Sequence, residues 1–316
     1  MPTLTALIPL DGTRLSESAF SMLPLSQKLG VNKVVLVATW ESLWQEQSLG
    51  RRDSELQEVA EKGRSYLHSY LAAQAERVRP FGFQVEVDVR VGRAAEEVLS
   101  AASNTGADLI IIATHGRDGI ARWRLGSVAD KIVRHADCPT IVVGPNVNKE
   151  LEPYSLRRIL VPLDGTPLAE EALPVATWIA QANGAEFDLV RVVSLPGAGI
   201  YDGMGYSVDL LTDIEDAARA YLAEVAARLE KRVAVRTELL LGDAGDQLLA
   251  HMKETPSELV VVASHGRAGL VRTALGSVAD RMLHGPAPVL ILRPEQVNGR
   301  FVQAALNLEQ PAATSG

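Results

Sequence analysis

The sequence predicts an α/β protein made of two tandem copies of one doubly wound domain, each with a five-stranded, mostly parallel sheet flanked by helices. The motif PLDGT occurs at 9–13 and again, unchanged, at 162–166. The eighteen residues from Thr114 match those from Ser264 at eleven positions. In both halves, short apolar runs alternate with longer helical stretches, which is typical of βαβ units. Because the offset between the copies falls only from 153 to 150 residues, each half is a complete copy.

Short apolar runs predict the strands, which are buried on both faces where the apolar run is unbroken. In the first copy they are 4–10, 34–39, 85–91, 108–113 and 140–143. In the second copy they are 159–163, 187–193, 233–241, 258–263 and 289–292. Helical stretches separate them: 15–29 and 52–79, then 168–182 and 209–231, with one further helix before the fourth strand and one before the fifth strand of each copy. Pro24 and Pro174 interrupt the first helix of each copy, since proline breaks the backbone hydrogen-bond ladder.

These elements predict the domain boundaries. The first domain spans 1–145 and the second 156–294, and the polar segment Pro145–Ser155 links them. The remaining residues, 295–316, form a C-terminal tail that ends in PAATSG and is expected to fray.

Composition excludes several classes of protein. A net charge of −8 argues against a general nucleic-acid binder, which is usually basic. The single cysteine, Cys138, excludes an intrachain disulfide. The N-terminal segment has no basic region before its apolar run, and no stretch approaches the ~18 apolar residues of a membrane span. We therefore expect a cytoplasmic protein with neither nucleic acid nor membrane as a partner.

The repeated polar residues lie where strands of the predicted sheet end. In open parallel sheets, ligands bind beyond the carboxyl ends of the strands, at the point where strand order reverses. Asp11 and Asp164 follow the first strand of each copy. The residues that follow the fourth strand, or open the helix after it, are His115, Gly116, Gly126 and Ser127, with His265, Gly266, Gly276 and Ser277 in the second copy.

This pattern is typical of a nucleotide site. Glycine lets backbone amides approach a phosphate, and a helix N-terminus supplies free N–H groups. The serine hydroxyls add a donor or a metal contact, and the aspartates can accept hydrogen bonds from ribose hydroxyls or an adenine amine. Four arginines add positive charge on the same loops: Arg117, Arg122, Arg267 and Arg272.

Structural interpretations of the same residues stay open. The segments SVAD at 127–130 and 277–280 fit helix capping boxes, and Asp-Gly-Thr fits a turn with a helix cap. The two histidines fit strand-end positions without catalytic roles. The glycine-rich segment 195–205 resembles a dinucleotide fingerprint only weakly, and a lid or a flexible linker fits it as well. The chain has no Walker motif, no zinc-ligand spacing and no G-x-S-x-G elbow.

Taken together, these residues resemble the universal stress protein family, whose ATP-binding branch carries G-x-x-G-x9-G-[S/T] after the fourth strand of a Rossmann-like fold. Here the pattern runs from Ala113 to Ser127 and from Ala263 to Ser277, so alanine replaces the first glycine in both copies. The resemblance implies ATP, with Mg²⁺ or Mn²⁺ held through its phosphates. The residues that it implies for phosphate are Gly116, Gly126 and Ser127, with Gly266, Gly276 and Ser277. Those that it implies for adenosine are Asp11 and Asp164, with backbone groups of Thr39 and Val192 meeting the adenine.

The function predicted on this basis is that of an ATP-binding, cytoplasmic stress-response regulator. Nucleotide binding in each copy would modulate conformation or assembly, with little or slow hydrolysis. Two other hypotheses stay open: an interaction or structural module that no longer binds nucleotide, and an enzyme that cleaves ATP at the α-phosphate. Single domains of this family commonly pair through their last strand. The resemblance therefore implies an intrachain pseudo-dimer through 140–143 and 289–292, with homodimerisation as a further possibility.

Overall fold

A computed structural model of the chain describes residues 3–40, 53–114, 125–147, 155–194, 208–264 and 275–309, with only the backbone given at 53–60, 208–210 and 308–309. The chain divides into two compact units. Unit 1 is chiefly Met1–Pro145 and unit 2 is chiefly Ser155–Asn298. Each unit is described by itself.

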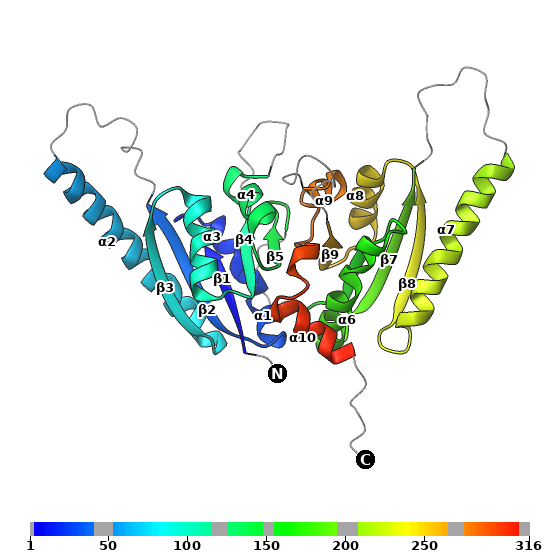
Figure 1. Cartoon of the computed structure of the whole chain (residues 1–316), viewed down its shortest axis with the longest axis horizontal. Coiled ribbons are helices and arrows are strands. Elements are labelled where there is room, and N and C mark those ends of the chain that lie inside the picture. Colours follow the sequence, from blue (N-terminus) through cyan, green and yellow to red (C-terminus); the bar gives the residue numbers. More distant parts are fainter. Residues whose placement is uncertain are drawn as a thin grey trace, which may run out of the picture. The chain divides into compact units, whose positions relative to one another are not determined.

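Unit 1 contains five strands in the order β3-β2-β1-β4-β5, and every neighbouring pair is parallel. The strands are β1 (Leu4–Pro9), β2 (Val31–Trp40), β3 (Gln84–Val91), β4 (Leu109–Ala113) and β5 (Thr140–Val143). Their carboxyl ends lie along one edge of the sheet, the upper edge in Figure 1. The strand order reverses between β1 and β4, so ligand binding is expected beyond the ends of these two strands.

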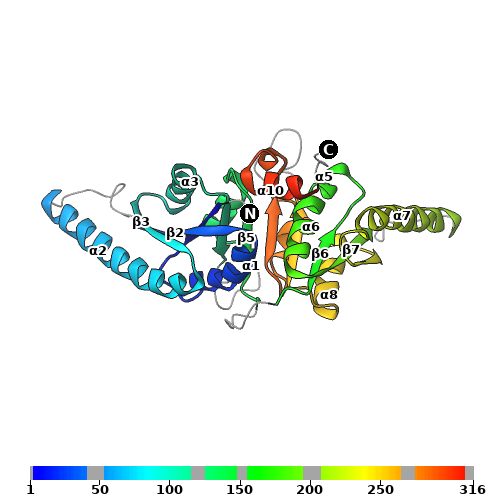
Figure 2. The ribbon, with the colours of Figure 1, turned by 90° about the horizontal axis from the view of Figure 1, so that it is seen from below.

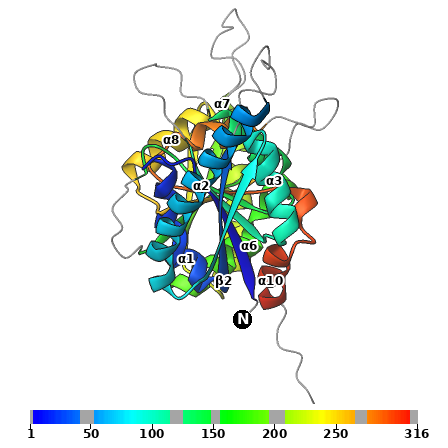
Figure 3. The same ribbon diagram turned by 90° about the vertical axis from the view of Figure 1, so that its left-hand side faces the viewer.

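Helices cover both faces of this sheet. They are η1 (Ser16–Met22), α1 (Leu23–Lys28), α2 (Asp53–Val78), η2 (Arg79–Phe81), α3 (Ala94–Thr105) and α4 (Ser127–His135). Figures 2 and 3 show α1 and α2 on one face of β2 and β3 and α3 on the other. Strands β4 and β5 are buried along their whole length, which confirms the doubly covered parallel sheet that the apolar runs predict.

Unit 2 repeats this arrangement, with the strand order β10-β9-β6-β7-β8 and parallel pairing throughout. Its strands are β6 (Arg158–Pro162), β7 (Glu186–Val193), β8 (Val235–Leu241), β9 (Leu259–Ala263) and β10 (Val289–Leu292). Its helices are α5 (Pro167–Glu170), α6 (Ala172–Asn183), α7 (Val208–Leu229), α8 (Ala244–Glu254) and α9 (Ser277–Met282). Figure 2 shows α6 and α8 on opposite faces of β6 and β7.

Proline interrupts the first helix of each unit, as predicted. In unit 1 the chain forms the 3₁₀-helix η1 and then α1, which has Pro24 in its first turn. In unit 2 it forms the four-residue α5 and then α6, with Pro174 near its start. Proline is tolerated in a first turn because its missing N–H has no partner there in any helix.

The prediction of a frayed tail after Pro294 is wrong for residues up to 309. Residues Pro294–Gln296 form the 3₁₀-helix η3, and Arg300–Glu309 form helix α10. Phe301 and Ala305, one helical turn apart, are 0% and 1% exposed. The burial of this apolar pair stabilises the helix, whereas the segment PAATSG lies outside the described residues. Within the described part of the chain, no helix is both long enough and apolar enough to cross a bilayer.

A buried ionisable pair distinguishes the core of unit 2. Nε2 of His251, on α8, lies 2.6 Å from Oδ2 of Asp188, on β7, and both side chains are at most 7% exposed. The hydrogen bond to Asp188 raises the pKa of His251, although burial acts against it. Unit 1 has the apolar residues Ala101 and Val35 at the equivalent positions of α3 and β2.

This pair predicts a pH-dependent stability for unit 2. A histidine whose pKa is higher in the folded state contributes its full stabilisation below the unfolded pKa of about 6.5, and loses it as pH rises through the folded pKa. We expect the free energy of unfolding of unit 2 to fall as pH rises from about 6.5, as measured by urea denaturation at a series of pH values.

The matched control takes its residues from unit 1. In the double variant Asp188→Val/His251→Ala, this pH-dependent loss should be absent above about 6.5. Parallel losses in the wild type and the double variant would show that the pair is not the cause.

Candidate functional site

An identical turn follows the first strand of each unit. In unit 1, Oδ1 of Asp11 accepts hydrogen bonds from the backbone N (2.9 Å) and Oγ1 (2.6 Å) of Thr13. In unit 2, Oδ1 of Asp164 accepts the same two bonds from Thr166, at 2.9 and 2.6 Å. Both aspartates are exposed, so each turn presents a carboxylate at the carboxyl edge of its sheet, beside the switch point.

The turn also starts the next helix. The hydroxyl of Thr13 accepts from the backbone N of Ser16 (3.2 Å), and that of Thr166 accepts from Ala169 (3.3 Å). The intervening glycines have φ of +84° at Gly12 and +86° at Gly165, a left-handed conformation that side chains disfavour. The turn interpretation of Asp-Gly-Thr is thus confirmed in both units, and the cap in unit 2, where Thr166 is the N-cap of α5; the N-cap of η1 is Leu15. Each aspartate stays at the surface.

The capping-box interpretation of the serines is wrong. Gly126 and Gly276, in extended conformation, are the N-cap residues of α4 and α9, and Ser127 and Ser277 are the first helical residues. Neither serine hydroxyl has a hydrogen-bond partner among the described residues, and both side chains are exposed. The carboxylate of Asp130 pairs with Arg134.

In unit 2, the end of β9 is joined to the start of α9. The hydroxyl of Ser264 accepts a hydrogen bond from the backbone N of Gly276 at 3.3 Å. A methyl group on Gly276 would lie 3.1 Å from that hydroxyl oxygen, so glycine allows this close approach. The serine that follows β9 and the glycine that opens α9 therefore lie together.

The strand register places the two predicted adenine contacts, Thr39 and Val192, at equivalent positions in the two units. The backbone N of Leu10 donates to the carbonyl of Val37, and Leu163 donates to Val190, both at 2.8 Å. Thr39 and Val192 each lie two residues further along β2 and β7, near their carboxyl ends. Several predicted residues lie outside the described residues: Gly116, Gly266, His115, His265, the four loop arginines and the segment 195–205.

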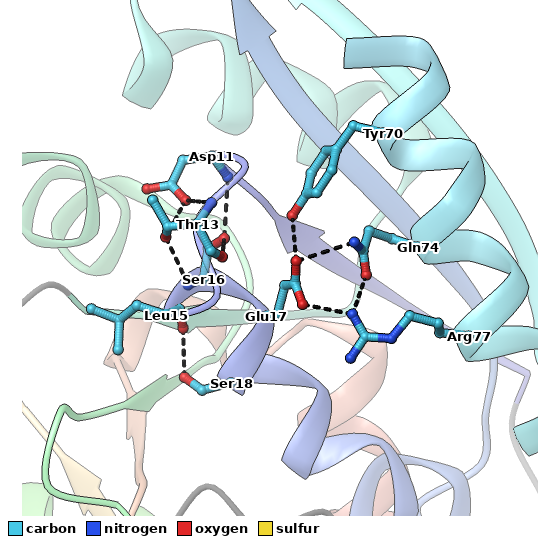
Figure 4. Close-up of polar contacts among 9 residues, drawn as sticks. All are labelled: Asp11, Thr13, Leu15, Ser16, Glu17, Ser18, Tyr70, Gln74 and Arg77. Atoms are coloured by element: carbon cyan, nitrogen blue, oxygen red, sulfur yellow. Dashed lines mark hydrogen bonds and ion pairs between the residues drawn. The ribbon is translucent and has the colours of Figure 1, made fainter. Parts of the chain in front are cut away.

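A cluster that the sequence analysis missed lies beside each aspartate turn (Figure 4). Glu17, on η1, accepts hydrogen bonds from Tyr70 (3.2 Å), Gln74 (3.1 Å) and Arg77 (2.6 Å), all on α2. Since η1 follows the Asp11 turn directly, the cluster ties that turn to the long helix.

Unit 2 contains the same contacts of glutamate with tyrosine and arginine, with Val225 in place of Gln74. Glu170, on α5, accepts from the hydroxyl of Tyr221 (3.0 Å) and from Nη2 of Arg228 (2.6 Å), both on α7. The sequence carries a signal for it, the pattern Y-L-A-x-x-A-x-R at 70–77 and 221–228. Burial, together with the nearby glutamate, raises the pKa of Tyr70 to about 12 and also raises the pKa of Tyr221. Both phenols are therefore protonated hydrogen-bond donors at neutral pH.

The open pocket of about 950 Å³ in unit 2 is elsewhere, at the amino ends of β6 and β7. Its charged groups are already paired. Arg158 binds Glu186 through two nitrogens, at 2.6 and 2.8 Å, and Glu258 accepts from the backbone of Arg157 and Arg158. Because open parallel sheets bind ligands at their carboxyl ends, the aspartate turns remain the better candidate.

The Glu170 cluster predicts a stability effect. Glu170→Ala leaves the half-buried Tyr221 hydroxyl and the Arg228 guanidinium without their acceptor, so we expect the free energy of unfolding to fall by about 1–3 kcal/mol in chemical denaturation. The adjacent variant Glu171→Ala, at an exposed position, should change it by less than about 0.5 kcal/mol. Equal losses in the two variants would contradict this role for Glu170.

Comparisons with known proteins agree with this geometry. A sequence profile described as "Universal stress protein family" matches residues 4–144 and 155–293. One universal stress protein of Mycobacterium tuberculosis is 32% identical over 197 residues, which cover 59% of this chain and 62% of that relative's length. A second from the same organism is 27% identical over 251 residues, which cover 75% of this chain and 78% of the relative.

Solved structures support the fold. A universal stress protein from Archaeoglobus fulgidus superposes with a TM-score of 0.67 at 19% identity, covering 93% of this chain and 99% of that one. Because the family profile matches both halves of the chain, this protein belongs to the universal stress protein family, as a tandem form with two domains.

Proposed function

We propose that each unit binds ATP with a divalent cation, and that the protein acts in the cytoplasm as a nucleotide-sensing regulator of the stress response. The observation that carries this proposal is the repetition of one constellation. Both units keep an exposed aspartate in an identical turn after the first strand, and a Gly-Ser pair that opens the helix after the fourth.

The aspartates suit the nucleoside end of the ligand. One oxygen of each carboxylate is held by the following threonine, which fixes the orientation of the side chain. No described residue donates a hydrogen bond to the other oxygen of Asp164, so that oxygen can accept from ribose hydroxyls. Backbone groups at Thr39 and Val192, on the neighbouring strand, would meet the adenine.

The Gly-Ser segments suit the phosphates. The first backbone N–H groups of α4 and α9 have no carbonyl partner within their helices, and an N-cap glycine leaves room for an anion beside them. The hydroxyls of Ser127 and Ser277 are exposed and lack a hydrogen-bond partner among the described residues, which fits a contact to phosphate or to its Mg²⁺ or Mn²⁺. The cation would neutralise phosphate charge.

The alanines that depart from the family pattern fit this proposal. Ala113 is the last residue of β4 and pairs with Val143 of β5, and Ala263 pairs with Leu292 of β10. Both positions have strand geometry, which alanine adopts without strain. The substitutions therefore place one methyl group at a strand end and require no left-handed conformation.

Regulation rather than rapid catalysis fits the side chains near the turns. Glu17 and Glu170 already accept two or more hydrogen bonds each, and the tyrosines beside them are donors, so none of these groups is poised to activate water. We expect hydrolysis to be slow. Binding would instead stabilise the nucleotide-bound conformation or assembly by mass action.

Calorimetry of the full chain with ATP and Mg²⁺ tests the proposal. We expect two binding events per chain. Asp11→Asn and Asp164→Asn should each weaken one of them about 10-fold, because asparagine keeps the turn but loses the charge that strengthens a hydrogen bond to ribose. Asp213→Asn, an exposed position on α7, is the control. Absence of binding, or affinities unchanged in the double variant, would refute the proposal and favour an interaction module.

Replacing the serines separates a ligand role from a structural one. In the double variant Ser127→Ala/Ser277→Ala, the free energy of unfolding should stay within about 0.5 kcal/mol of the wild type, because neither serine is an N-cap. The affinity for ATP should fall several-fold. A loss of about 1 kcal/mol in stability with unchanged affinity would instead indicate capping residues.

A further inference from the structure

Unit 2 carries a cation at the nucleoside end of its candidate site that has no counterpart at the equivalent position of β2 in unit 1. Arg191, on β7, follows Val190, and Ala38 occupies the equivalent position after Val37 on β2. Arg191 immediately precedes Val192, the proposed adenine contact. The side chain of Arg191 reaches the Asp164 turn, whose geometry is otherwise the same in both units.

The guanidinium group of Arg191 lies beside the Tyr221 ring and the Gly165 turn. Its Cζ lies 4.9 Å from the centroid of the Tyr221 ring. A methyl group on Gly165 would lie 3.0 Å from Nη2, 3.1 Å from Cζ and 3.2 Å from Nη1. These nearly equal distances place that methyl position over the plane of the group and not in line with an N–H bond. Beside Gly12, in unit 1, the same position is open space.

The N–H edges of this guanidinium are available. Arg191 has no hydrogen bond or ion pair within the described part of the chain. The nearby carboxylate of Glu170 accepts its hydrogen bonds from the Tyr221 hydroxyl and from Arg228 instead of from Arg191. Asp164 uses Oδ1 for its own turn. With one face beside the Gly165 turn and no ion pair to a residue that the structure describes, Arg191 is positioned to receive an anion through its edge.

We propose that Arg191 makes the unit 2 site selective for nucleotides that carry a phosphate monoester on the ribose, at the 2′ or 3′ oxygen. This inference rests on the proposed binding of adenosine beside Asp164. In such a ligand, Asp164 accepts the remaining ribose hydroxyl and Arg191 binds the added phosphate. Unit 1, with Ala38 at the equivalent strand position and open space beside Gly12, has no cation here among its described residues and binds nucleotides without that preference.

Calorimetry of the full chain with three probes tests the selectivity: AMP, adenosine 2′,5′-bisphosphate and adenosine 3′,5′-bisphosphate. In the wild type, one of the two sites should bind at least one bisphosphate about 10-fold more tightly than AMP, a gain typical of a charge-assisted arginine–phosphate contact. Comparison of the two bisphosphates identifies which ribose oxygen carries the recognised group.

Variants assign the effect to Arg191. Arg191→Ala should abolish the preference, whereas Arg236→Ala, which removes an exposed arginine of β8, should retain it. Ala38→Arg should confer the preference on unit 1, where Tyr70 corresponds to Tyr221 and the space beside Gly12 is open.

Two results would overturn the inference alone: bisphosphates that bind no more tightly than AMP while ATP still fills two sites, or a preference that survives Arg191→Ala. An increase in ATP affinity on Arg191→Ala, without loss of a bisphosphate preference, would show that the arginine only occupies space. Absence of ATP binding to the wild type would overturn this inference together with the proposed function.

Discussion

Burial of the sheet on both faces is the constraint on which the rest of each unit depends. Helices cover the sheet from two sides, so strands such as β4 and β10 are apolar at every residue and offer no place for a charged group. Apart from the hydrogen-bonded Asp188–His251 pair, the polar groups that a ligand could reach are therefore expected at the strand ends. At the carboxyl edge the order reverses between β1 and β4, and between β6 and β9, and the chain leaves β1 and β6 there through the aspartate turns.

The aspartate turn connects that edge to the helical layer. Its threonine accepts a hydrogen bond from a backbone N–H in the first turn of the next helical segment. That segment carries the glutamate that binds the long helix. A ligand that contacts Asp11 would thus contact a segment hydrogen-bonded to α2 through Glu17, Tyr70 and Arg77. These hydrogen bonds couple the candidate site to a long helix without any catalytic group. Such coupling fits the proposal that ligand binding changes conformation or assembly.

The sequence predicted the strands well because long apolar runs report burial directly; the bounds of β5 and β10 were predicted to the residue. It failed where tertiary contacts decide. Six of the ten residues of α10 are apolar, but the sequence alone does not show that Phe301 and Ala305 have a surface to pack against. A Gly-Ser pair does not reveal which residue caps the helix. Glu17 and Tyr70 are far apart in sequence, so their contact was visible only as a repeated pattern in α2 and α7.

Divergence between the two units is informative because it occurs against a retained framework. The turns, their glycine conformations and the glutamate–tyrosine contacts are the same in both units, so differences around them are not consequences of a different backbone. Some differences are internal, such as the His251–Asp188 pair in place of Ala101 and Val35. Arg191 is of another kind, because it adds a charge with no ion pair among the described residues, beside the exposed aspartate that both turns keep. An unpaired charge would destabilise a buried core because it would lose its hydration, whereas a bound anion would pair with it.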